Sequence, residues 1–424
     1  MTARGLISLL IYGLFVAGLA TRNGTLLTLA LPLIGYLAFG LYFAPNASKL
    51  QVTRSFSADR VPAGVPVEVS LTILNQGPLI ESLIVEDRLP LGVRVEEGEA
   101  RILARLAEGE SVTLRYSVVS GRGSYHFDEL DVQVSEAFGL MTKHAQLSAP
   151  GQIVVLPVVQ SLRDVAIRPR RTRGFSGTIP ARQGGPGVAF YGIREYQPGD
   201  PTRWINARAS ARSQEQLYVN EFEQERATDV CVVLDVRRSN SVEIGKDSLL
   251  EYAVQAAAAV SDALLTRGNR VALLQYGQSL NWTIPGYGKM QRERIFQALA
   301  EARLGDSIAF ANLENLPIHL FPARSQLIFI SSLIDDSDQL FRNLRARGFQ
   351  VMLISPDPIS FEYQLSPKLP TFELGRRIAR LEREQRLTRL RRIGIQVVNW
   401  DVSMPLTQLA QVALSRPAVF IPEA

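Results

Sequence analysis

The chain is poor in the residue types that most often hold metals or crosslinks. It has one cysteine, Cys231, and three histidines in 424 residues. A single cysteine excludes a disulfide framework, so burial of apolar surface has to hold the fold together. The histidines are scattered and no H-E-x-x-H pattern occurs, which excludes the usual zinc sites. Cys231 stands inside an apolar run, where we expect it to pack in the core and not to act as a nucleophile. The histidines are His126, His144 and His319.

The chain also lacks a nucleotide-binding signature. No G-x-G-x-x-G run opens a helix after a strand. The run GYGKM at 286–290 faintly resembles a phosphate loop, but the first glycine of that motif is missing. Met290 also stands where a Ser or Thr should hold magnesium. With no nucleophile, acid–base pair or phosphate loop in view, the sequence predicts no enzyme and no cofactor.

Composition sets only broad limits. Hydrophobic residues make up 46% of the chain and charged residues 21%, as in an ordinary globular protein. The length suits two or three domains. The formal net charge of +5 and the pI near 9.4 are compatible with an anionic membrane surface or nucleic acid, but they require neither.

Long apolar runs occur at the amino terminus. Residues 5–21 and 25–43 carry no charge, and each approaches the ~20 residues that span a bilayer. Arg22, Asn23 and Gly24 make a polar break between them, which predicts a transmembrane hairpin over residues 1–46. A signal peptide is the alternative for the first run, and a second run directly behind it argues against that.

The charges around the hairpin predict its orientation. Arg4, Lys49, Arg54 and Arg60 lie on one side, and the loop offers only Arg22. The positive-inside rule then places both ends of the hairpin in the cytoplasm. We therefore expect a multi-pass membrane protein whose soluble domains lie on the cytoplasmic side.

The next two segments differ in character. Residues 47–160 contain short alternating runs such as VPVEVSLTILN, separated by Gly and Pro turns, which predicts a β-sandwich. Residues 161–228 form an arginine-rich segment and linker. Its cluster RPRRTR at 168–173 is followed by a glycine-rich stretch at 174–187. We expect the cluster to be solvated or near anionic lipid, with nucleic-acid binding as an alternative.

Residues 229–424 alternate between strand and helix patterns, which is typical of an α/β, doubly wound parallel sheet. The long helix at 373–392 should pack on the sheet as an amphipathic helix, through Ile378, Leu381, Leu387, Leu390 and Ile393. Contact with anionic lipid is its functional alternative. The expected strands are 230–236, 270–275, 280–284, 326–331, 349–354 and 395–400, and the expected helices are 247–267, 289–303, 337–347, 373–392 and 405–414.

The most distinctive stretch runs from Tyr191 to Ser241. It reads YGIREYQPGDPTRWINARASAR…LYVNEFEQER…VVLD and ends with an apolar strand and Asp235. This run resembles the family called domain of unknown function 58, whose members resemble von Willebrand factor A domains preceded by such a segment. GRGSY at 121–125 and FGL at 138–140 also resemble the pattern of these proteins. The resemblance covers most of the chain, and it implies an association with MoxR-type AAA+ ATPases.

The resemblance also implies a divalent-ion site at Asp235. Von Willebrand A domains bind the ion through Asp-x-Ser-x-Ser after the first strand and through an aspartate in a later loop. Here Arg237 replaces the first serine, and a guanidinium beside Asp235 should form an ion pair and repel a cation. Ser241 could act for Ser239. Asp335 could replace the later aspartate, although capping of the next helix explains Asp335 more simply. We therefore expect a degenerate metal site.

The arginines of the stretch allow three interpretations. They could brace the sheet edge through carboxylates, form a docking patch for a partner or lipid, or hold a catalytic anion. The candidate partner-binding residues are Arg194, Tyr196, Asp200, Arg203, Arg208, Arg212 and Arg237.

Three hypotheses for function follow from these observations. The first is a membrane-anchored adaptor that works with a MoxR-type AAA+ ATPase in the assembly or maturation of partner proteins. The second is a metal-dependent enzyme or ion-dependent adhesion module at the Asp235 loop. The third is nucleic-acid binding through the arginine clusters, which we do not expect.

Overall fold

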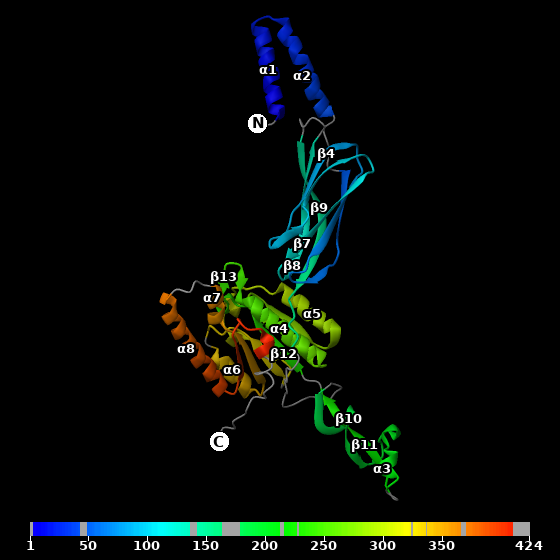
Figure 1. The fold of residues 1–424 in the computed structure, drawn as a ribbon, viewed down its shortest axis with the longest axis vertical. Coiled ribbons are helices and arrows are strands. Elements are labelled where there is room, and N and C mark those ends of the chain that lie inside the picture. Colours follow the sequence, from blue (N-terminus) through cyan, green and yellow to red (C-terminus); the bar gives the residue numbers. More distant parts are fainter. Residues whose placement is uncertain are drawn as a thin grey trace. The chain divides into compact units, whose positions relative to one another are not determined.

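A computed structural model of the protein (Figure 1) describes residues 3–42, 49–135, 142–162, 179–212, 216–226, 229–323, 325–335, 337–365 and 370–409. The chain divides into two compact units, Met1–Leu156 and Pro157–Ala424. The arginine cluster at 168–173, the start of the glycine-rich stretch and the FGL run at 138–140 lie outside the described residues.

Two apolar helices open the first unit, α1 (Ala3–Ala20) and α2 (Gly24–Tyr42). They pack on each other, and at the turn between them the Asn23 side-chain oxygen accepts the N–H of Thr25 at 3.1 Å. Several apolar side chains on them are exposed, including Leu9 at 62% and Leu19 at 68%. Within the described ranges, no helix is both long and apolar enough to qualify as a membrane span. The predicted hairpin is thus present as two helices, and the prediction that it spans a membrane remains unsupported.

The strands of the first unit form an all-β region, as the sequence predicts. One sheet has the order β1-β3-β7-β5 and the other the order β2-β9-β8-β4-β6. Alternate residues of β3 enter the core shared by the two sheets, from Val67 to Ile73, because successive strand side chains point to opposite faces. The bounds are β1 (Leu50–Phe56), β2 (Arg60–Pro62), β3 (Val67–Asn75), β4 (Ile80–Asp87), β5 (Val93–Glu97), β6 (Arg101–Leu106), β7 (Ser111–Ser120), β8 (Gly123–Ser135) and β9 (Thr142–Leu156).

The second unit begins with an antiparallel pair, β10 (Ile179–Glu195) and β11 (Tyr218–Arg226). Between these strands lie η2 (Thr202–Trp204) and α3 (Ala207–Ser210). Asn206 caps α3, because its Oδ1 accepts the N–H of Ala209 at 3.0 Å. Its Nδ2 donates to Oδ1 of Asn220 on β11 at 2.7 Å. We call residues 192–220 the arginine hairpin.

A six-stranded sheet of order β16-β15-β12-β17-β18-β19 forms the rest of the second unit. All neighbouring strands are parallel except β16, which is antiparallel to β15. This confirms the predicted α/β arrangement with a mainly parallel sheet. The bounds are β12 (Asp229–Asp235), β15 (Arg270–Tyr276), β16 (Leu280–Gly286), β17 (Gln326–Ile330), β18 (Gln350–Pro356) and β19 (Gln396–Trp400). A separate small ribbon joins β13 (Glu243–Ile244) and β14 (Asp247–Ser248).

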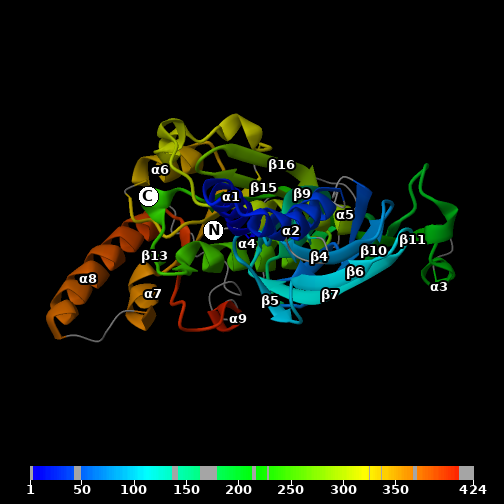
Figure 2. The ribbon, with the colours of Figure 1, turned by 90° about the horizontal axis from the view of Figure 1, so that it is seen from above.

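Helices cover the sheet on both faces (Figure 2). Cys231 and Val233 of β12 share a buried cluster with residues of α6 and α8, while α4 contacts the same strands from the opposite face. Cys231 is fully buried, as predicted. The helices are α4 (Leu249–Thr266), α5 (Gly288–Glu301), α6 (Asp338–Ala346), α7 (Pro358–Leu365), α8 (Pro370–Arg392) and α9 (Leu406–Leu409).

The prediction for the long helix is wrong in one respect. Leu387 and Leu390 of α8 are buried on the sheet, but Ile378 is 50% exposed and Leu381 is 72% exposed. Ile378 and Leu387 are nine residues apart, which places them on opposite sides of the helix at about 100° per residue. Helix α7 and the short turns of 3₁₀ helix between residues 308 and 320 were not predicted.

Candidate functional site

The candidate site lies at the carboxyl ends of β12 and β17. Both strands are wholly apolar at their centres, and from Val230 to Leu234 and from Leu327 to Ile330 every residue is buried. Such continuous apolar strands pair in the middle of a parallel sheet covered on both faces. Because parallel strands end at the same edge, Asp235 after β12 and Ser331 after β17 meet there. The Ser331 Oγ donates to Asp235 Oδ2 at 2.7 Å.

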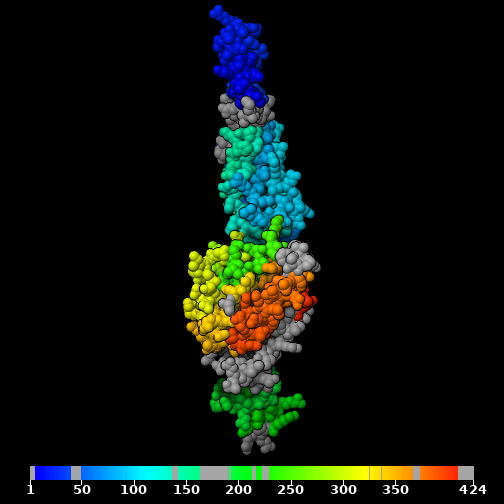
Figure 3. Space-filling view, turned by 90° about the vertical axis from the view of Figure 1, so that its left-hand side faces the viewer, coloured from blue at the N-terminus to red at the C-terminus, as the bar shows by residue number. Residues whose placement is uncertain are grey.

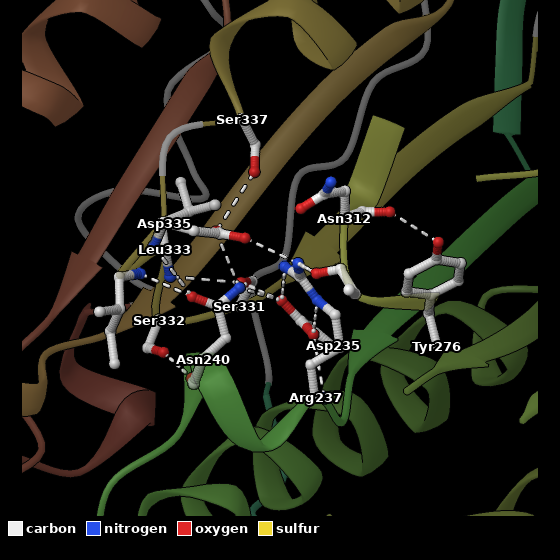
Figure 4. Close-up of polar contacts among 12 residues, drawn as sticks. Asp235, Arg237, Asn240, Tyr276, Asn312, Ser331, Ser332, Leu333, Asp335 and Ser337 are labelled. Atoms are coloured by element: carbon white, nitrogen blue, oxygen red, sulfur yellow. Dashed lines mark hydrogen bonds and ion pairs between the residues drawn. The ribbon is translucent and has the colours of Figure 1, made fainter. Parts of the chain in front are cut away.

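Arg237 occupies the centre of this edge (Figure 4). Its Nε donates to Asp235 Oδ1 at 2.9 Å and its Nη2 to Asp235 Oδ2 at 2.8 Å, so the pair is bidentate. The side chain of Arg237 is 3% exposed and that of Asp235 is 1% exposed. Two parallel N–H···O⁻ bonds fix the guanidinium plane as well as its position. The predicted ion pair between Arg237 and Asp235 is confirmed.

A second carboxylate holds the same guanidinium from a loop. Asp335 Oδ2 accepts from Arg237 Nη1 at 2.7 Å, and the Ala311 carbonyl accepts from the same nitrogen at 2.7 Å. The interpretation of Asp335 as a helix cap is therefore wrong: Ser337 occupies the N-cap position of α6, and the loop turns the Asp335 side chain back to the sheet edge. Burial tends to lower the pKa of Arg237, but bonds to and attraction by Asp235, then Asp335, raise it above its ordinary value.

Asn240 ties the two loops together, and the sequence analysis missed it. Its Nδ2 donates to Asp235 Oδ2 at 2.8 Å and to Asp335 Oδ1 at 2.9 Å. Its Oδ1 accepts the backbone N–H of Ile334 at 2.7 Å and that of Asp335 at 3.2 Å. An amide supplies both donors and an acceptor, which neither a carboxylate nor a hydroxyl alone can do here. Carboxylate and hydroxyl oxygens are the expected ligands of a hard cation, so the motif does not single out Asn240, the one amide in the loop.

Glycines let the neighbouring loops approach β12 closely. A Cβ on Gly277, which follows β15, would lie 2.7 Å from the carbonyl oxygen of Val236. A Cβ on Gly305 would lie 2.6 Å from the backbone nitrogen of Gln278. With no side chain in the way, Gly305 exchanges two backbone hydrogen bonds with the start of the Arg237 loop, at 3.0 and 3.1 Å. The start of the loop that carries Arg237 is thus fixed by the backbone of Gly305.

The donor set does not fit a divalent cation. Such an ion needs several converging oxygens, but both oxygens of Asp235 already accept from Arg237, Asn240 and Ser331. Ser239 is exposed, and Ser241 is half-buried just after η3 (Arg238–Asn240). In the described part of the chain, no group of three His, Cys, Asp or Glu residues could hold a metal. Of the four predicted ligands, the structure brings together Asp235 and Asp335, and a guanidinium lies between them.

A second buried arginine fills the next part of the edge, and the sequence analysis also missed it. Arg383 of α8 is 5% exposed and donates to the Ser332 carbonyl at 2.7 Å. It also donates to Oδ1 of Asn399 at 2.9 Å and lies 3.1 Å from Asp357. Burial lowers the pKa of Arg383 to about 10, and Asp357 offsets only part of that effect. The available signal was its spacing, because Arg383 shares a helix face with Leu387 and Leu390 at i+4 and i+7.

The arginine hairpin carries the other predicted residues. Arg194 forms a bidentate pair with Asp200, with both bonds at 2.7 Å, and lies 3.7 Å from Glu221. The hydrogen bonds from Arg194 hold the pKa of Asp200 below its ordinary value. Tyr196 is half-buried, whereas Arg203, Arg208 and Arg212 are exposed.

The residues of the predicted partner-binding set therefore have different roles. Arg194 and Asp200 brace the hairpin internally, while the exposed Arg203, Arg208 and Arg212 point their charge at solvent. Arg237 has to leave this set, because its guanidinium is buried and bonded to Asp235, Asp335 and Ala311.

Comparison with known proteins supports a family relationship for part of the chain. Residues 192–356 match the family described as "Protein of unknown function DUF58". This confirms the resemblance over the arginine hairpin and the sheet from β12 to β18. No curated protein is similar enough to the chain to count as a relative.

Several solved structures overlap with about a quarter of the chain. A FixG-related protein from Vibrio parahaemolyticus is 7% identical, with 26% of this chain and 98% of that chain covered and a TM-score of 0.19. The CARDB domain of a protein from Pyrococcus furiosus is 18% identical, with 25% and 91% covered and a TM-score of 0.18. A non-cellulosomal cohesin from Archaeoglobus fulgidus is 16% identical, with 25% and 92% covered and a TM-score of 0.18. Overlaps of this size carry no argument about function.

Proposed function

We propose that this protein is a membrane-anchored adaptor that binds other proteins and works with a MoxR-type AAA+ ATPase in their assembly or maturation. The ATPase partner is implied by the resemblance to the domain of unknown function 58 family. The observation that carries the adaptor role is the arginine hairpin, in which an internal Arg194–Asp200 pair leaves three other arginines exposed. Arginine forms bidentate bonds with carboxylates, so an acidic surface on the ATPase is the expected contact.

The sheet edge supports a binding role over catalysis. The carboxyl edge is where α/β sheets place ligands, yet here Arg237 and Arg383 fill it and their donors are bonded to protein oxygens. The likeness to von Willebrand A domains belongs to this proposal, as a scaffold for protein contacts that works without an ion. The edge then serves to fix the loops, and recognition takes place on the surface.

Attachment to a membrane is also part of the proposal. Its support is the apolar character of α1 and α2 and the exposure of side chains such as Leu6 at 55%, Leu10 at 53% and Leu31 at 63%. Exposed apolar side chains in such number favour a lipid or protein environment over water. A flotation assay of the full chain with lipid vesicles, compared with a chain that starts at residue 47, tests the attachment.

The adaptor role is tested by affinity measurement with the purified MoxR-type ATPase of the same genome. We expect the triple variant Arg203→Glu, Arg208→Glu, Arg212→Glu to bind at least tenfold more weakly, because three exposed attractive charges become repulsive. The matched control reverses Arg294, Arg303 and Arg342, which are exposed on the α/β domain and change the net charge equally. Equal loss in both variants, or no binding by the wild-type chain, would overturn the proposed ATPase contact.

A further inference from the structure

Helix α8 has two apolar faces, and the sheet uses only one of them. Leu387 and Leu390 are buried on the sheet together with Arg383. On the opposite side, Leu374 is 67% exposed, Ile378 is 50% exposed and Leu381 is 72% exposed. Figure 2 shows α8 reaching out from the rest of the α/β domain, and Figure 3 shows its orange surface open on one side of that domain. We call Leu374, Ile378 and Leu381 the α8 stripe.

The spacing of the α8 stripe is that of a coiled-coil seam. Steps of four and three residues place Leu374 at d, Ile378 at a and Leu381 at d of a heptad. In the same register Arg383 and Leu390 take position f and Leu387 takes position c, which is the side away from the seam. The burial of these three residues on the sheet therefore agrees with the register and leaves the seam free.

The charges beside the α8 stripe are complementary to a second copy of the same helix. Arg377 takes position g and Glu382 takes position e of the next heptad, and both are exposed. In a parallel two-stranded coiled coil, g of one helix meets e of the following heptad on its partner. Arg377 of each copy would then face Glu382 of the other, twice in one dimer. Ile at a with Leu at d is also the combination that favours parallel dimers.

We infer that the α8 stripe is a self-association surface, through which two copies of this chain pair their α8 helices in parallel. The seam contains three apolar residues per chain before Gln385 and Thr388 follow at a and d. A seam this short gives a weak dimer in dilute solution, since isolated helices of few turns are marginal in water. Any anchoring that confines two copies to one surface raises their effective concentration and favours the pair. The inference does not depend on the ATPase partner.

The chain is well suited to a cysteine test of this pairing. Its native thiol, Cys231, is buried, and burial raises the pKa of that thiol to about 12, so it stays unreactive. Gln385→Cys puts one accessible thiol at position a, directly on the seam of a parallel dimer. Glu362→Cys, on the exposed side of α7, is the matched control. We expect copper–phenanthroline oxidation of the full-length protein to crosslink Gln385→Cys at least fivefold faster than Glu362→Cys.

Charge reversal then identifies the contact. In the Gln385→Cys background, Arg377→Glu should slow crosslinking several-fold because Glu then faces Glu, and Arg377→Glu with Glu382→Arg should restore it. Restoration by Glu384→Arg in place of Glu382→Arg would overturn the parallel register. Equal rates for Gln385→Cys and Glu362→Cys would overturn self-association.

Vesicle binding tests the alternative occupant of the α8 stripe. If the protein does not crosslink but binds anionic vesicles, and the double variant Leu374→Ser, Leu381→Ser loses that binding, the stripe contacts lipid instead. Circular dichroism checks that each variant is folded. We expect all of them to fold, because the substituted side chains are exposed.

Discussion

The two units of the chain each bury an arginine against an aspartate, and they use the pair differently. In the sandwich, Arg54 of β1 is bonded to Asp87, and both side chains are 0% exposed. In the α/β domain, Arg237 and Asp235 are almost as buried, but the third member, Asp335, is 31% exposed. The Arg54–Asp87 pair lies in the core between two sheets. The Arg237–Asp235 pair lies at the end of a strand, beside loops.

The surroundings explain what each pair does. Arg54 also donates to the Ala149 carbonyl and lies 5.0 Å from the centre of the Phe127 ring, while Tyr116 donates to Asp87. These groups come from strands of both sheets, so the network fixes how the sheets face each other. The Arg237 network instead joins loops after β12 and β17. Each buried arginine thus holds together the elements that supply its hydrogen-bond partners, and its removal should destabilise those elements first.

The largest effect is expected from Arg54→Ala. It leaves Asp87 buried without its cation, and breaking a buried pair costs about 3 to 5 kcal/mol. Hydrogen exchange of peptides from β3 and β7 should report this loss, while peptides from β12 and β17 stay protected. The control is Arg88→Ala, whose partner Asp131 is exposed, and which should cost about 0 to 1 kcal/mol. Similar hydrogen-exchange rates for β3 and β7 in Arg54→Ala and Arg88→Ala would contradict the role of Arg54 in holding the two sheets together.

Arg237→Ala should cost about 3 kcal/mol, at the lower end of the range for a buried pair, because water reaches Asp335. It also frees Asp235 and Asp335 beside the Ser331 hydroxyl, which together offer oxygens to a hard cation. Millimolar magnesium should therefore raise the urea midpoint of Arg237→Ala and leave wild type and Arg54→Ala unchanged. If magnesium stabilises all three proteins equally, the guanidinium does not occupy a cation position.

Asn240→Ala should have an intermediate effect, confined to the edge. It removes the acceptor of two backbone N–H groups and a donor shared by two carboxylates. Leaving such groups unpaired costs about 1 to 3 kcal/mol. Amide exchange at Ile334 and Asp335, followed by nuclear magnetic resonance, should accelerate more than the global stability change explains. Asn281→Ala, at an exposed position of β16, should leave those amides unchanged.

The smallest effect concerns pH and the arginine hairpin. The pKa of Asp200 is held below its ordinary value by Arg194 and by the N–H of Gln197. A depressed carboxyl pKa contributes stability above the ordinary value, and this contribution is lost as pH falls through the depressed value. We expect the hairpin to loosen only below about pH 4, seen as chemical-shift changes at Arg194 and Gln197. Asp200→Asn should abolish that titration, and its persistence would assign it to another group.

The fold was largely accessible from the sequence because its signals are local. Apolar strands, a small-residue helix and glycine stops recur along residues 229–400, and the six strands of the large sheet and helices α4, α5, α6 and α8 were predicted near their observed positions. The strands of the first unit could be predicted equally well, because apolar and polar residues alternate along them. Helix α7 (Pro358–Leu365) was missed because it is only eight residues long and has no clear apolar periodicity.

The site was less accessible because its contacts are long-range. Arg237 next to Asp235 could be recognised as an ion pair from two positions in the sequence. Asp335 lies 98 residues from Arg237, and helix capping was a sufficient local explanation for it. Arg383 and Asn240 were passed over because an arginine in a basic helix and an amide in a loop look ordinary until their partners are known.

Arg237 also decides which conditions the sheet edge responds to. The charge of Arg237 belongs to the side chain itself, and the raised pKa of Arg237 keeps the guanidinium protonated across the pH range of a living cell. A chelator could remove a bound metal ion, and the occupancy of a metal site could vary with cellular ion levels. Neither applies to the guanidinium of Arg237. Only a change to the side chain itself, by mutation or chemical modification, would remove it. We therefore expect chelators and changes in calcium or magnesium concentration to leave the conformation of these loops unchanged.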